Sequence, residues 1–424
     1  ELRVTYRAMK RYFAFVLFLF LSLSIFASIT VRDDLFKSDE ELKNFKVKAV
    51  TKDEEEYYSS MNIYLLTGGE GSLIWENFGH SAFVVTTPNG VDVAFDYGIF
   101  TFDENFLPSF ILGKLYYEVW ETYALYRISS LEDEDRTVSL LPLNLTNNEK
   151  KAMYSFLLYN TKEENKTYLY DYFSDNCATR LRDIYSYAKG DDFYSFLQKE
   201  SNETIRYSVN KHLSRSTFFV SWAINYLLGP SVDKKATLWD MCYLPSALEK
   251  AIKDYQGNES TTIYETKERK ATPEKWNIDF YSLLFGLVLL SLSLLAYYKK
   301  FNKVNDLLLA IVLLLFGVMS LVLLFLSLFT IHYVTHSNLN IFIISPLVLI
   351  SSFFHFASLR KERKEKQIAI VNTVMLIILI LTVLVRLLFS SLLIQNIWAP
   401  TIVGFFLYAA EALPYMIKKK LINR

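Results

Sequence analysis

Cysteine is scarce in this chain, which has 424 residues but only two cysteines, Cys177 and Cys242. There is no CxxC pair and no cluster of cysteine and histidine with the spacing of metal ligands. We therefore expect no structural zinc site. We also assign no other metal site and no cofactor. Two cysteines allow one disulfide bond, but nothing in their spacing requires it.

The chain also lacks an excess of charge. Its 45 Lys and Arg residues balance 45 Asp and Glu residues, so the formal net charge is zero. Proteins that bind nucleic acid present a basic surface, so we expect no nucleic acid among the partners. We find no internal repeats, and the length allows two or three domains.

The first long apolar run lies near the N-terminus. Met9-Lys10-Arg11 precedes a run from residue 12 to residue 30, and this order is typical of a signal peptide or signal anchor. We therefore assign residues 1–30 to a leader. No lipobox cysteine follows it, so we do not expect the protein to be a lipoprotein itself.

Five more apolar runs follow residue 276, and each has about the 20 residues needed to cross a bilayer. They lie at 279–298, 305–329, 339–358, 368–392 and 398–417. Basic residues cluster after the first, third and fifth runs, whereas the loops 330–338 and 393–397 have none. By the positive-inside rule these loops and the preceding domain lie on the outer face, which is the periplasm of a diderm bacterium. We expect a periplasmic catalytic domain at 31–275 and an inner-membrane five-helix domain at 276–424.

Residues 31–275 mix strands and helices. We predict strands at 61–66, 81–87 and 91–97, with Asn89-Gly90 as a two-residue hairpin loop. In that register His80 and Tyr97 share one face of the sheet, and Asp96 points to the other face. We predict helices at 147–160, 177–188, 191–200 and 217–228, and a polar linker at 252–275.

Cys177 is the strongest candidate for chemistry. Ser174, Asp175 and Asn176 precede it, and all three are good helix N-cap residues, so a helix should begin at the cysteine. The N–H groups and the dipole at a helix start stabilise a thiolate. His80 lies at the start of a predicted strand, and together the two residues form the constellation of a Cys/His nucleophilic enzyme. The alternatives for Cys177 are a buried apolar role and a disulfide bond.

His80 precedes Cys177 by 177 − 80 = 97 residues. Papain-type enzymes have the cysteine first, so this order fits a circularly permuted version of their arrangement. The Cys177 N–H is the natural oxyanion donor, with Asn77 or Asn176 as a second donor, and Tyr97 can orient His80. Helix capping and sheet packing are the alternative roles for these last three residues.

Short motifs spread along the chain resemble the Lnb N-terminal periplasmic domain family. The matching stretches before the membrane part are Leu65-Leu66-Thr67, Phe78-Gly79-His80-Ser81-Ala82, Asp96-Tyr97-Gly98-Ile99-Phe100, Asn105-Phe106, Leu112-Gly113-Lys114-Leu115-Tyr116-Tyr117, Asp175-Asn176-Cys177-Ala178-Thr179-Arg180, Leu228-Gly229-Pro230 with Asp233, and Tyr243-Leu244-Pro245. The loop 335–340, with Pro346, resembles the membrane part of the family. Cys242 departs from the pattern, because a bulky apolar residue is expected there, which favours a packing role for it.

The resemblance implies a lipoprotein N-acyltransferase of Bacteroidota, which acylates the α-amino group of the lipid-modified N-terminal cysteine of lipoproteins. It implies an α+β fold, with a circularly permuted papain-like (NlpC/P60-like) domain followed by an all-α five-helix transmembrane bundle. Carried onto this sequence, Cys177 is the nucleophile and His80 the base. The partners are then lipoprotein N-termini and the membrane, with a phospholipid or a diacylglyceryl group as acyl donor. Both substrates are membrane-anchored, so a tethered site raises their effective concentration.

Three other functions fit parts of the sequence. A cell-wall peptidase or amidase uses the same Cys/His pair but does not need five membrane helices. A phospholipase uses the pair and the membrane, with water as the acceptor. A non-enzymatic envelope assembly protein needs neither Cys177 nor His80.

Four polar residues of the membrane part are candidate substrate-binding residues. Arg386 lies within the fourth apolar run, toward the outer leaflet, where a guanidinium can bind phosphate or ester oxygens. His336, Asn338 and Asn340 lie in or beside the first outer loop and can position a lipid head group. The alternative is that these residues cap helix ends and seal the bundle.

Overall fold

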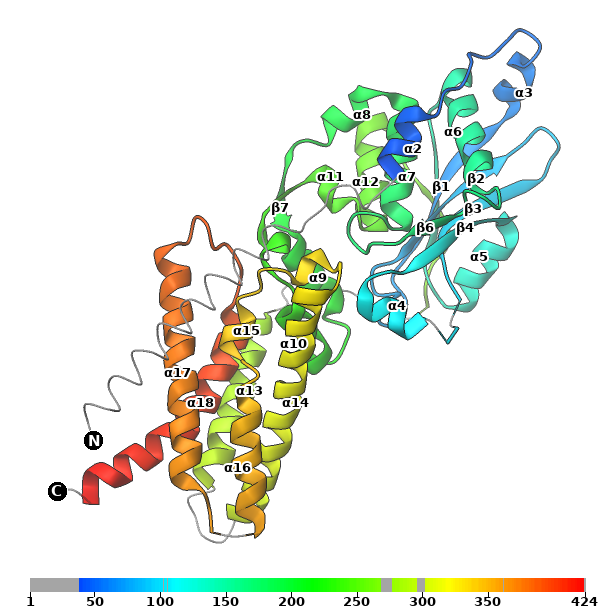
Figure 1. Ribbon diagram of the computed structural model, residues 1–424. Helices are drawn as coiled ribbons and strands as arrows, with labels where there is room; N and C mark the ends of the chain where they lie inside the picture. The colour runs from blue at the N-terminus through cyan, green and yellow to red at the C-terminus, as the bar shows by residue number, and fades with distance from the viewer. Residues whose placement is uncertain are drawn as a thin grey trace. The chain divides into compact units, whose positions relative to one another are not determined.

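The computed structural model describes residues 38–101, 103–104, 106–267, 277–295, 302–360 and 362–422. They form two compact units (Figure 1). The sheet unit comprises Arg32–Arg215 and Lys235–Pro273, and the helical unit comprises Ser216–Lys234 and Glu274–Arg424. The leader expected at 1–30 lies outside the described residues.

An antiparallel seven-stranded sheet organises the sheet unit, in the order β6-β4-β3-β2-β1-β5-β9 (Figure 1). Its strands are β1 (Asn62–Gly68), β2 (His80–Thr86), β3 (Asp92–Ile99), β4 (Tyr116–Tyr123), β5 (Val138–Pro142), β6 (Thr167–Leu169) and β9 (Thr261–Tyr264). A separate two-stranded sheet pairs β7 (Glu200–Thr204) with β8 (Lys235–Thr237).

Helices cover both faces of the large sheet. The helices of the sheet unit are α2 (Ser38–Asn44), α3 (Glu55–Ser60), α4 (Phe106–Leu112), α5 (Ala124–Asp133), α6 (Asn147–Asn160), α7 (Cys177–Lys189), α8 (Asp191–Phe196), α9 (Ile205–Leu213), α11 (Leu238–Met241) and α12 (Pro245–Gln256). On one face Phe83 and Phe95 pack in a core with Leu181 of α7. On the other face Ala82 packs in a core with Leu131 of α5. The alternation of side chains along β2 therefore sends odd residues toward α7 and even residues toward α5.

The hairpin between β2 and β3 corrects the predicted register by one residue. Thr86 pairs with Asp92, so the loop is Thr87–Val91 rather than two residues. Pro88 has no N–H and a fixed φ, so it takes the second position of a turn that starts at Thr87. The Gly90 N–H closes this turn on the Thr87 carbonyl, with a φ of +76° at Gly90. As a result, Asp96 lies on the face of the sheet that was assigned to Tyr97.

The helices predicted in the sheet unit begin where they were expected, but some of them end elsewhere. Helix α6 has the predicted bounds and α7 ends one residue beyond its predicted end, whereas α8 stops at Phe196 instead of residue 200. The linker expected at 252–275 is partly ordered structure, because α12 continues to Gln256 and β9 adds an edge strand to the sheet. This strand completes hydrogen bonds that β5 would otherwise leave unpaired.

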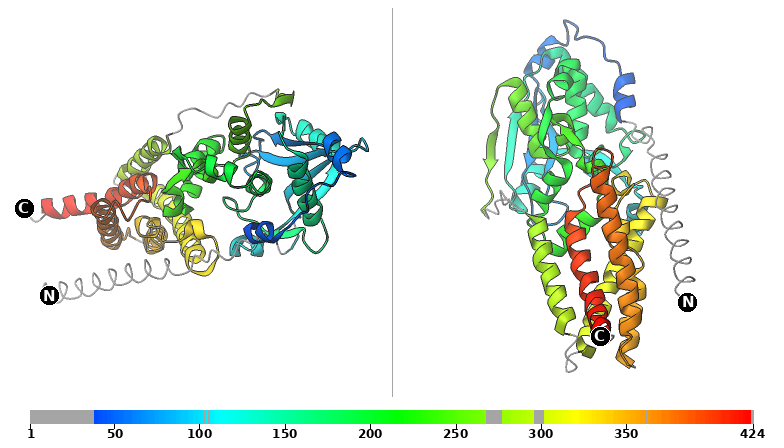
Figure 2. Two further views of the ribbon diagram at one scale, coloured as in Figure 1. Left: turned by 90° about the horizontal axis from the view of Figure 1, so that it is seen from above. Right: turned by 90° about the vertical axis from the view of Figure 1, so that its left-hand side faces the viewer.

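The helical unit holds α10 (Phe218–Leu227), η2 (Pro230–Asp233), α13 (Ile278–Leu295), α14 (Asn302–Phe329), η3 (Tyr333–Thr335), α15 (Asn340–Ile343), α16 (Val348–Arg360), α17 (Glu365–Leu388) and α18 (Trp398–Ile422). Helix α14 packs on α16, α16 on α17, α17 on α18, and α18 on α13 (Figure 2). Among the described residues, the stretches Lys303–Phe329, Asn340–Arg360 and Glu365–Leu388 are long and apolar enough to cross a membrane. The apolar stretches of α13 and α18 are shorter and coincide with the first and fifth predicted spans.

Helix α10 belongs to the helical unit, although its residues lie within the range 31–275 that was expected to form the catalytic domain. It is apolar, and Trp222 and Tyr226 pack in the core of the membrane helices. The predicted helix at 217–228 is therefore present, but it packs with the bundle because its apolar surface is buried there.

Candidate active site

The N-terminus of α7 is built by a reciprocal cap. Asn176 has an extended backbone, and its Oδ1 accepts hydrogen bonds of 2.9 Å from the N–H groups of Ala178 and Thr179. In return, the Asn176 N–H donates to Thr179 Oγ1 at 2.7 Å. This capping box makes Cys177 the first helical residue, as the sequence predicts. The thiol is buried and lies where the helix dipole favours negative charge.

A buried ion pair holds the loop that leads into this helix. Both oxygens of Asp175 accept hydrogen bonds from the Arg180 guanidinium, at 2.6 and 3.0 Å. The guanidinium also lies 3.7 Å from the centre of the Tyr168 ring. Burial raises the pKa of Asp175 to about 6, although Arg180 opposes the shift. The bidentate geometry orients the chain immediately before Cys177.

His80 has a carboxylate partner that the predicted register excluded. Ala82 pairs with Asp96, so His80 and Asp96 share one face of the sheet. Nε2 of His80 lies 2.5 Å from Asp96 Oδ1, and the other carboxylate oxygen lies 2.7 Å from Nε of Arg127. Arg127 belongs to α5, which covers this face. With Nε2 facing Asp96, Nδ1 of His80 remains for the thiol.

Tyr97 does not orient His80. It points to the α7 side of the sheet, where its hydroxyl donates a 2.9 Å hydrogen bond to Asn160 Oδ1. Burial raises the pKa of this phenol. Its place in the site is taken by Asp96, because a one-residue change of register exchanges the two faces of a strand.

Cys177 and His80 meet at the end of the sheet beside Gly98. A bulge between Tyr97 and Ile99 places Gly98 at φ +90°, which favours glycine. A Cβ at this position would lie 3.7 Å from the Cys177 Cβ, so the missing side chain leaves Cys177 room against the strand. The sulfur makes hydrogen bonds with the His80 ring and with the Ser81 N–H.

These contacts set the charge of the pair. Burial by itself raises the pKa of the Cys177 thiol, but the charge and hydrogen bond of His80 and the Ser81 N–H outweigh it, so the thiol pKa is lowered. Burial by itself lowers the pKa of His80, but the carboxylate of Asp96 outweighs it, so the imidazole pKa is raised. Both directions favour a thiolate beside an imidazolium.

The predicted second oxyanion donors have different positions. The Asn176 side chain donates to the carbonyls of Tyr172 and Tyr243, at 2.9 and 2.8 Å, so both of its N–H groups are used structurally. This corrects the proposed donor role of its amide. Asn77 is buried three residues before His80, and its role as a donor stays a prediction.

Cys242 is a packing residue in the structure. It is fully buried in the α7 core, and its sulfur contacts the Leu238 carbonyl at 3.2 Å. Burial raises the pKa of this thiol to about 12. Both cysteines are free, so the disulfide alternative for Cys177 is wrong.

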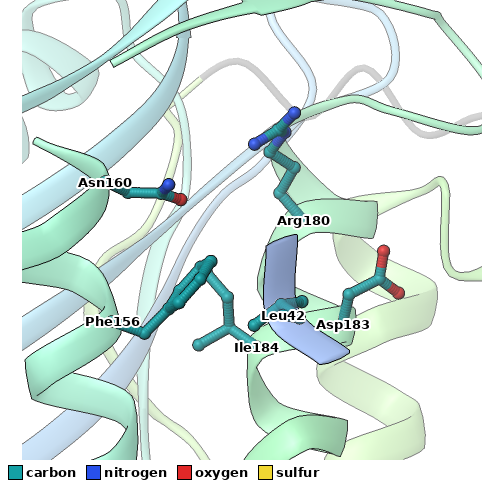
Figure 3. Close-up of a pocket in the computed structure, with 6 residues that line it drawn as sticks. All are labelled: Leu42, Phe156, Asn160, Arg180, Asp183 and Ile184. Atoms are coloured by element: carbon teal, nitrogen blue, oxygen red, sulfur yellow. The ribbon is translucent and has the colours of Figure 1, made fainter. Parts of the chain in front are cut away.

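A small cavity in the sheet unit is separate from the Cys177–His80 pair. It is lined by Leu42, Phe156, Asn160, Arg180, Asp183 and Ile184 (Figure 3). Two of its polar groups have structural partners, since Arg180 binds Asp175 and Asn160 accepts a hydrogen bond from Tyr97. Within the described residues no group of three or more His, Cys, Asp or Glu side chains is arranged to hold a metal, and we assign no metal ligands.

Two of the predicted substrate-binding residues attach α10 to the bundle. Asn338 donates to the carbonyls of Tyr226 and Leu227, at 3.1 and 2.9 Å, and Asn340 donates to that of Tyr226 at 2.9 Å. Gln395 also donates to Asn338 Oδ1, at 2.7 Å. A helix end leaves carbonyls without partners, and these amides satisfy them inside an apolar unit.

Arg386 and His336 also contact backbone carbonyls. Arg386 lies in the last turn of α17 and donates to the carbonyls of Gln395 and Ile394, at 3.1 and 3.3 Å. His336 is buried, with Nε2 3.1 Å from the Thr330 carbonyl. These contacts hold the loops 330–338 and 393–397 in shape, and lipid binding by these residues stays a prediction.

Sequence reasoning missed Asp96 and Arg127 as members of the site. Asp96 had a local signal, because a lone carboxylate within the apolar run Val93-Ala94-Phe95 and Tyr97 must have a partner when buried. Arg127 had no comparable signal, since it lies in α5, which follows β4 in the sequence and reaches the site only in the folded structure.

Two family matches cover both units. Residues 53–208 match the Lnb N-terminal periplasmic domain, and residues 272–416 match the Lnb transmembrane domain. No curated protein and no solved structure shows a significant match to the chain. The first range contains Cys177, His80 and Asp96, and the second contains most of the apolar helices. The chain therefore belongs to the Lnb family, as a membrane protein with a periplasmic domain and a transmembrane domain.

Proposed function

We propose that the protein is a lipoprotein N-acyltransferase of the inner membrane. It moves a fatty acyl chain from an ester lipid, a phospholipid or a diacylglyceryl group, to the α-amino group of the lipidated N-terminal cysteine of a lipoprotein. The observation that carries the proposal is the Cys177 thiol at a helix start, with a lowered pKa, beside a His80 imidazole with a raised pKa. The transmembrane domain fits two membrane-anchored substrates.

The first half-reaction forms a thioester. The Cys177 thiolate attacks the ester carbonyl carbon, and the N–H at the start of α7 can stabilise the oxyanion. As the tetrahedral intermediate collapses, the carbon–oxygen bond to glycerol breaks and the His80 imidazolium gives its proton to the leaving oxygen. Asp96 holds the ring, and its charge stabilises the imidazolium at the start of the step.

The second half-reaction forms an amide. The α-amine of the lipoprotein attacks the thioester carbonyl, and the neutral His80 imidazole takes a proton from the nitrogen. The carbon–sulfur bond then breaks, which restores the Cys177 thiolate and the imidazolium. Exclusion of water from the buried thioester favours the amine over hydrolysis.

We also propose that the sheet unit is a circularly permuted papain-like domain. Three features support this: the nucleophile begins a helix, that helix packs on an antiparallel sheet, and the histidine lies on the sheet. The histidine precedes the cysteine in sequence, which is the reverse of the papain order.

Lipid analysis of a purified lipoprotein tests the function. The full-length protein in vesicles is incubated with a diacylated lipoprotein, and the N-terminal peptide is examined by mass spectrometry. We expect N-acylation with the wild type, none with Cys177→Ala, and full activity with Cys242→Ala as the matched control. N-acylation by folded Cys177→Ala refutes the proposal, and release of free fatty acid without amide identifies a phospholipase instead.

A further inference from the structure

Three tyrosines occupy alternate positions in the segment that leads to Cys177, namely Tyr168, Tyr170 and Tyr172. Tyr168 lies in β6, and the Tyr170 N–H continues the strand pairing by donating to the Leu115 carbonyl at 2.7 Å. Alternate residues of an extended chain point to the same side. Tyr168 and Tyr170 therefore both face the α7 core, and their ring centroids are 6.5 Å apart.

The hydroxyls of these three tyrosines are hydrogen-bond donors beside Cys177. Burial raises the pKa of each phenol well above its ordinary value, and the charge of Cys177 adds to the rise, so all three stay protonated. The hydroxyls of Tyr168 and Tyr172 are buried, and the described part of the chain gives neither of them a hydrogen-bond partner. Buried donors without acceptors are uncommon, and a catalytic role is one explanation for them.

Tyr170 has the position that best suits such a role. A Cβ at Gly98 would lie 3.7 Å from Cε2 of Tyr170 and 3.7 Å from the Cys177 Cβ, and the hydroxyl is attached to the carbon next to Cε2. After burial, the Cys177 charge has the largest effect on the Tyr170 pKa, whereas other groups come before it for Tyr168 and Tyr172. Tyr170 is also partly exposed, whereas Tyr168 is buried, so an incoming acyl group can reach it.

The Tyr170 ring is held in a fixed position. It stacks on Tyr117, with centroids 4.2 Å apart and an angle of 27° between the ring planes. Its backbone is fixed by the hydrogen bond to the Leu115 carbonyl. A donor that is already in place needs no reorganisation when negative charge develops, which is the property of an oxyanion hole.

The start of α7 supplies one oxyanion donor. Asn176 Oδ1 accepts hydrogen bonds from the N–H groups of Ala178 and Thr179, so the Cys177 N–H lies outside the cap. The Asn176 amide is occupied by two carbonyls and cannot be the second donor. We propose that Tyr170 is a catalytic residue whose hydroxyl donates the second hydrogen bond to the oxyanion.

This inference rests on the proposed function and adds one group to its first half-reaction. As the bond between the Cys177 sulfur and the carbonyl carbon forms, the π electron pair moves onto the carbonyl oxygen. The Tyr170 hydroxyl donates to this oxygen and keeps its proton. When the electron pair returns, the bond to the leaving oxygen breaks, and the leaving oxygen takes its proton from His80. The phenol is therefore unchanged at the end of the step.

Two reactions of Cys177 test this role. p-Nitrophenyl acetate acylates a thiolate through a tetrahedral oxyanion, whereas iodoacetamide alkylates it in one displacement that forms no oxyanion. Both are measured on full-length protein carrying Cys242→Ala, with Cys177→Ala as the blank. We expect Tyr170→Phe to slow p-nitrophenolate release about 10²-fold, which is typical for loss of one oxyanion donor. The alkylation rate and its pH profile should stay within twofold of the wild type, because the ring and the thiolate remain.

Tyr116→Phe is the matched control and should change neither reaction. Tyr116 is 65% exposed and points to the side of β4 opposite to Tyr117. Acylation of Tyr170→Phe within threefold of the wild type overturns the proposal, and a large loss in Tyr168→Phe or Tyr172→Phe would then identify a different donor. Equal loss in acylation and alkylation also overturns it, because it indicates that Tyr170 supports the thiolate or the fold.

The proposed function is judged separately, by amide formation on a lipoprotein. A wild type that the ester acylates but that never acylates a lipoprotein amine refutes the proposed function, while the comparison of Tyr170→Phe with Tyr116→Phe still decides the role of the hydroxyl. A wild type that iodoacetamide alkylates but the ester does not acylate refutes both.

Discussion

Replacing Asp96 by asparagine removes the charge behind His80 while keeping the shape of the side chain. Asp96 is 2% exposed and lies 2.5 Å from Nε2 of His80, so little solvent replaces the lost charge. Unit charges about 4 Å apart interact by roughly 4 kcal/mol at an effective dielectric constant of about 20. Each 1.36 kcal/mol is tenfold in rate, so we expect Asp96→Asn to lower kcat/KM for acyl transfer about 10³-fold.

A second substitution, at Arg127, extends this prediction. It lies 2.7 Å from Asp96, and its charge opposes protonation of His80. In Asp96→Asn that guanidinium loses its partner and stays near the imidazole. Adding Arg127→Leu should therefore recover part of the lost activity, whereas two independent structural defects would add.

The pH profile separates a role in charge from a role in folding. The Asp96 carboxylate raises the pKa of His80, so the imidazolium form persists to higher pH in the wild type. Without the carboxylate the His80 pKa falls, and the alkaline limb of the activity profile should move to lower pH. Asp92→Asn, an exposed carboxylate at the other end of β3, is the control and should change neither rate nor profile. A folded Asp96→Asn variant with kcat/KM within threefold of the wild type refutes this reasoning.

Three further substitutions test the structural roles assigned to Asn176, Tyr97 and Asn338. Asn176→Ala loses the helix cap and leaves two buried carbonyls unpaired, so the free energy of unfolding, measured in urea, should fall by about 2–4 kcal/mol. The same variant should react more slowly with iodoacetamide at Cys177. Tyr97→Phe should cost about 1–2 kcal/mol of stability, yet keep acyl transfer within twofold; a 10²-fold loss would restore Tyr97 to the catalytic site. Asn338→Leu should lower the thermal midpoint in detergent without raising KM for lipid, and a raised KM at an unchanged midpoint would favour substrate binding instead.

Features with local physical causes were predicted well from the sequence. The start of α7 follows from capping residues next to Cys177, and a cap needs only the neighbouring backbone. Helix α6 begins at a capping box that lies within four residues of sequence. The apolar runs of the membrane part form helices, because a segment in lipid must satisfy every backbone polar group internally. The sequence therefore indicated the helix start at Cys177, the candidate pair of Cys177 and His80, and the two kinds of domain.

Features that depend on distant residues were decided by the tertiary structure. The partner of His80 depends on which residues pair across the hairpin, and the turn at Pro88 moves this register by one residue and so exchanges Tyr97 for Asp96. Arg127 enters the site only because α5 folds back over the sheet.

The position of α10 was also decided by contacts between distant residues. Its residues lie between two stretches of the sheet unit in sequence, but Asn338, Asn340 and Gln395 bind its C-terminal carbonyls more than 100 residues away. An apolar helix of ten residues has the same local pattern whether it is buried in a soluble core or in a membrane bundle. Only the packing of its surface and the partners of its last turn distinguish the two, and these are contacts between segments far apart in the chain.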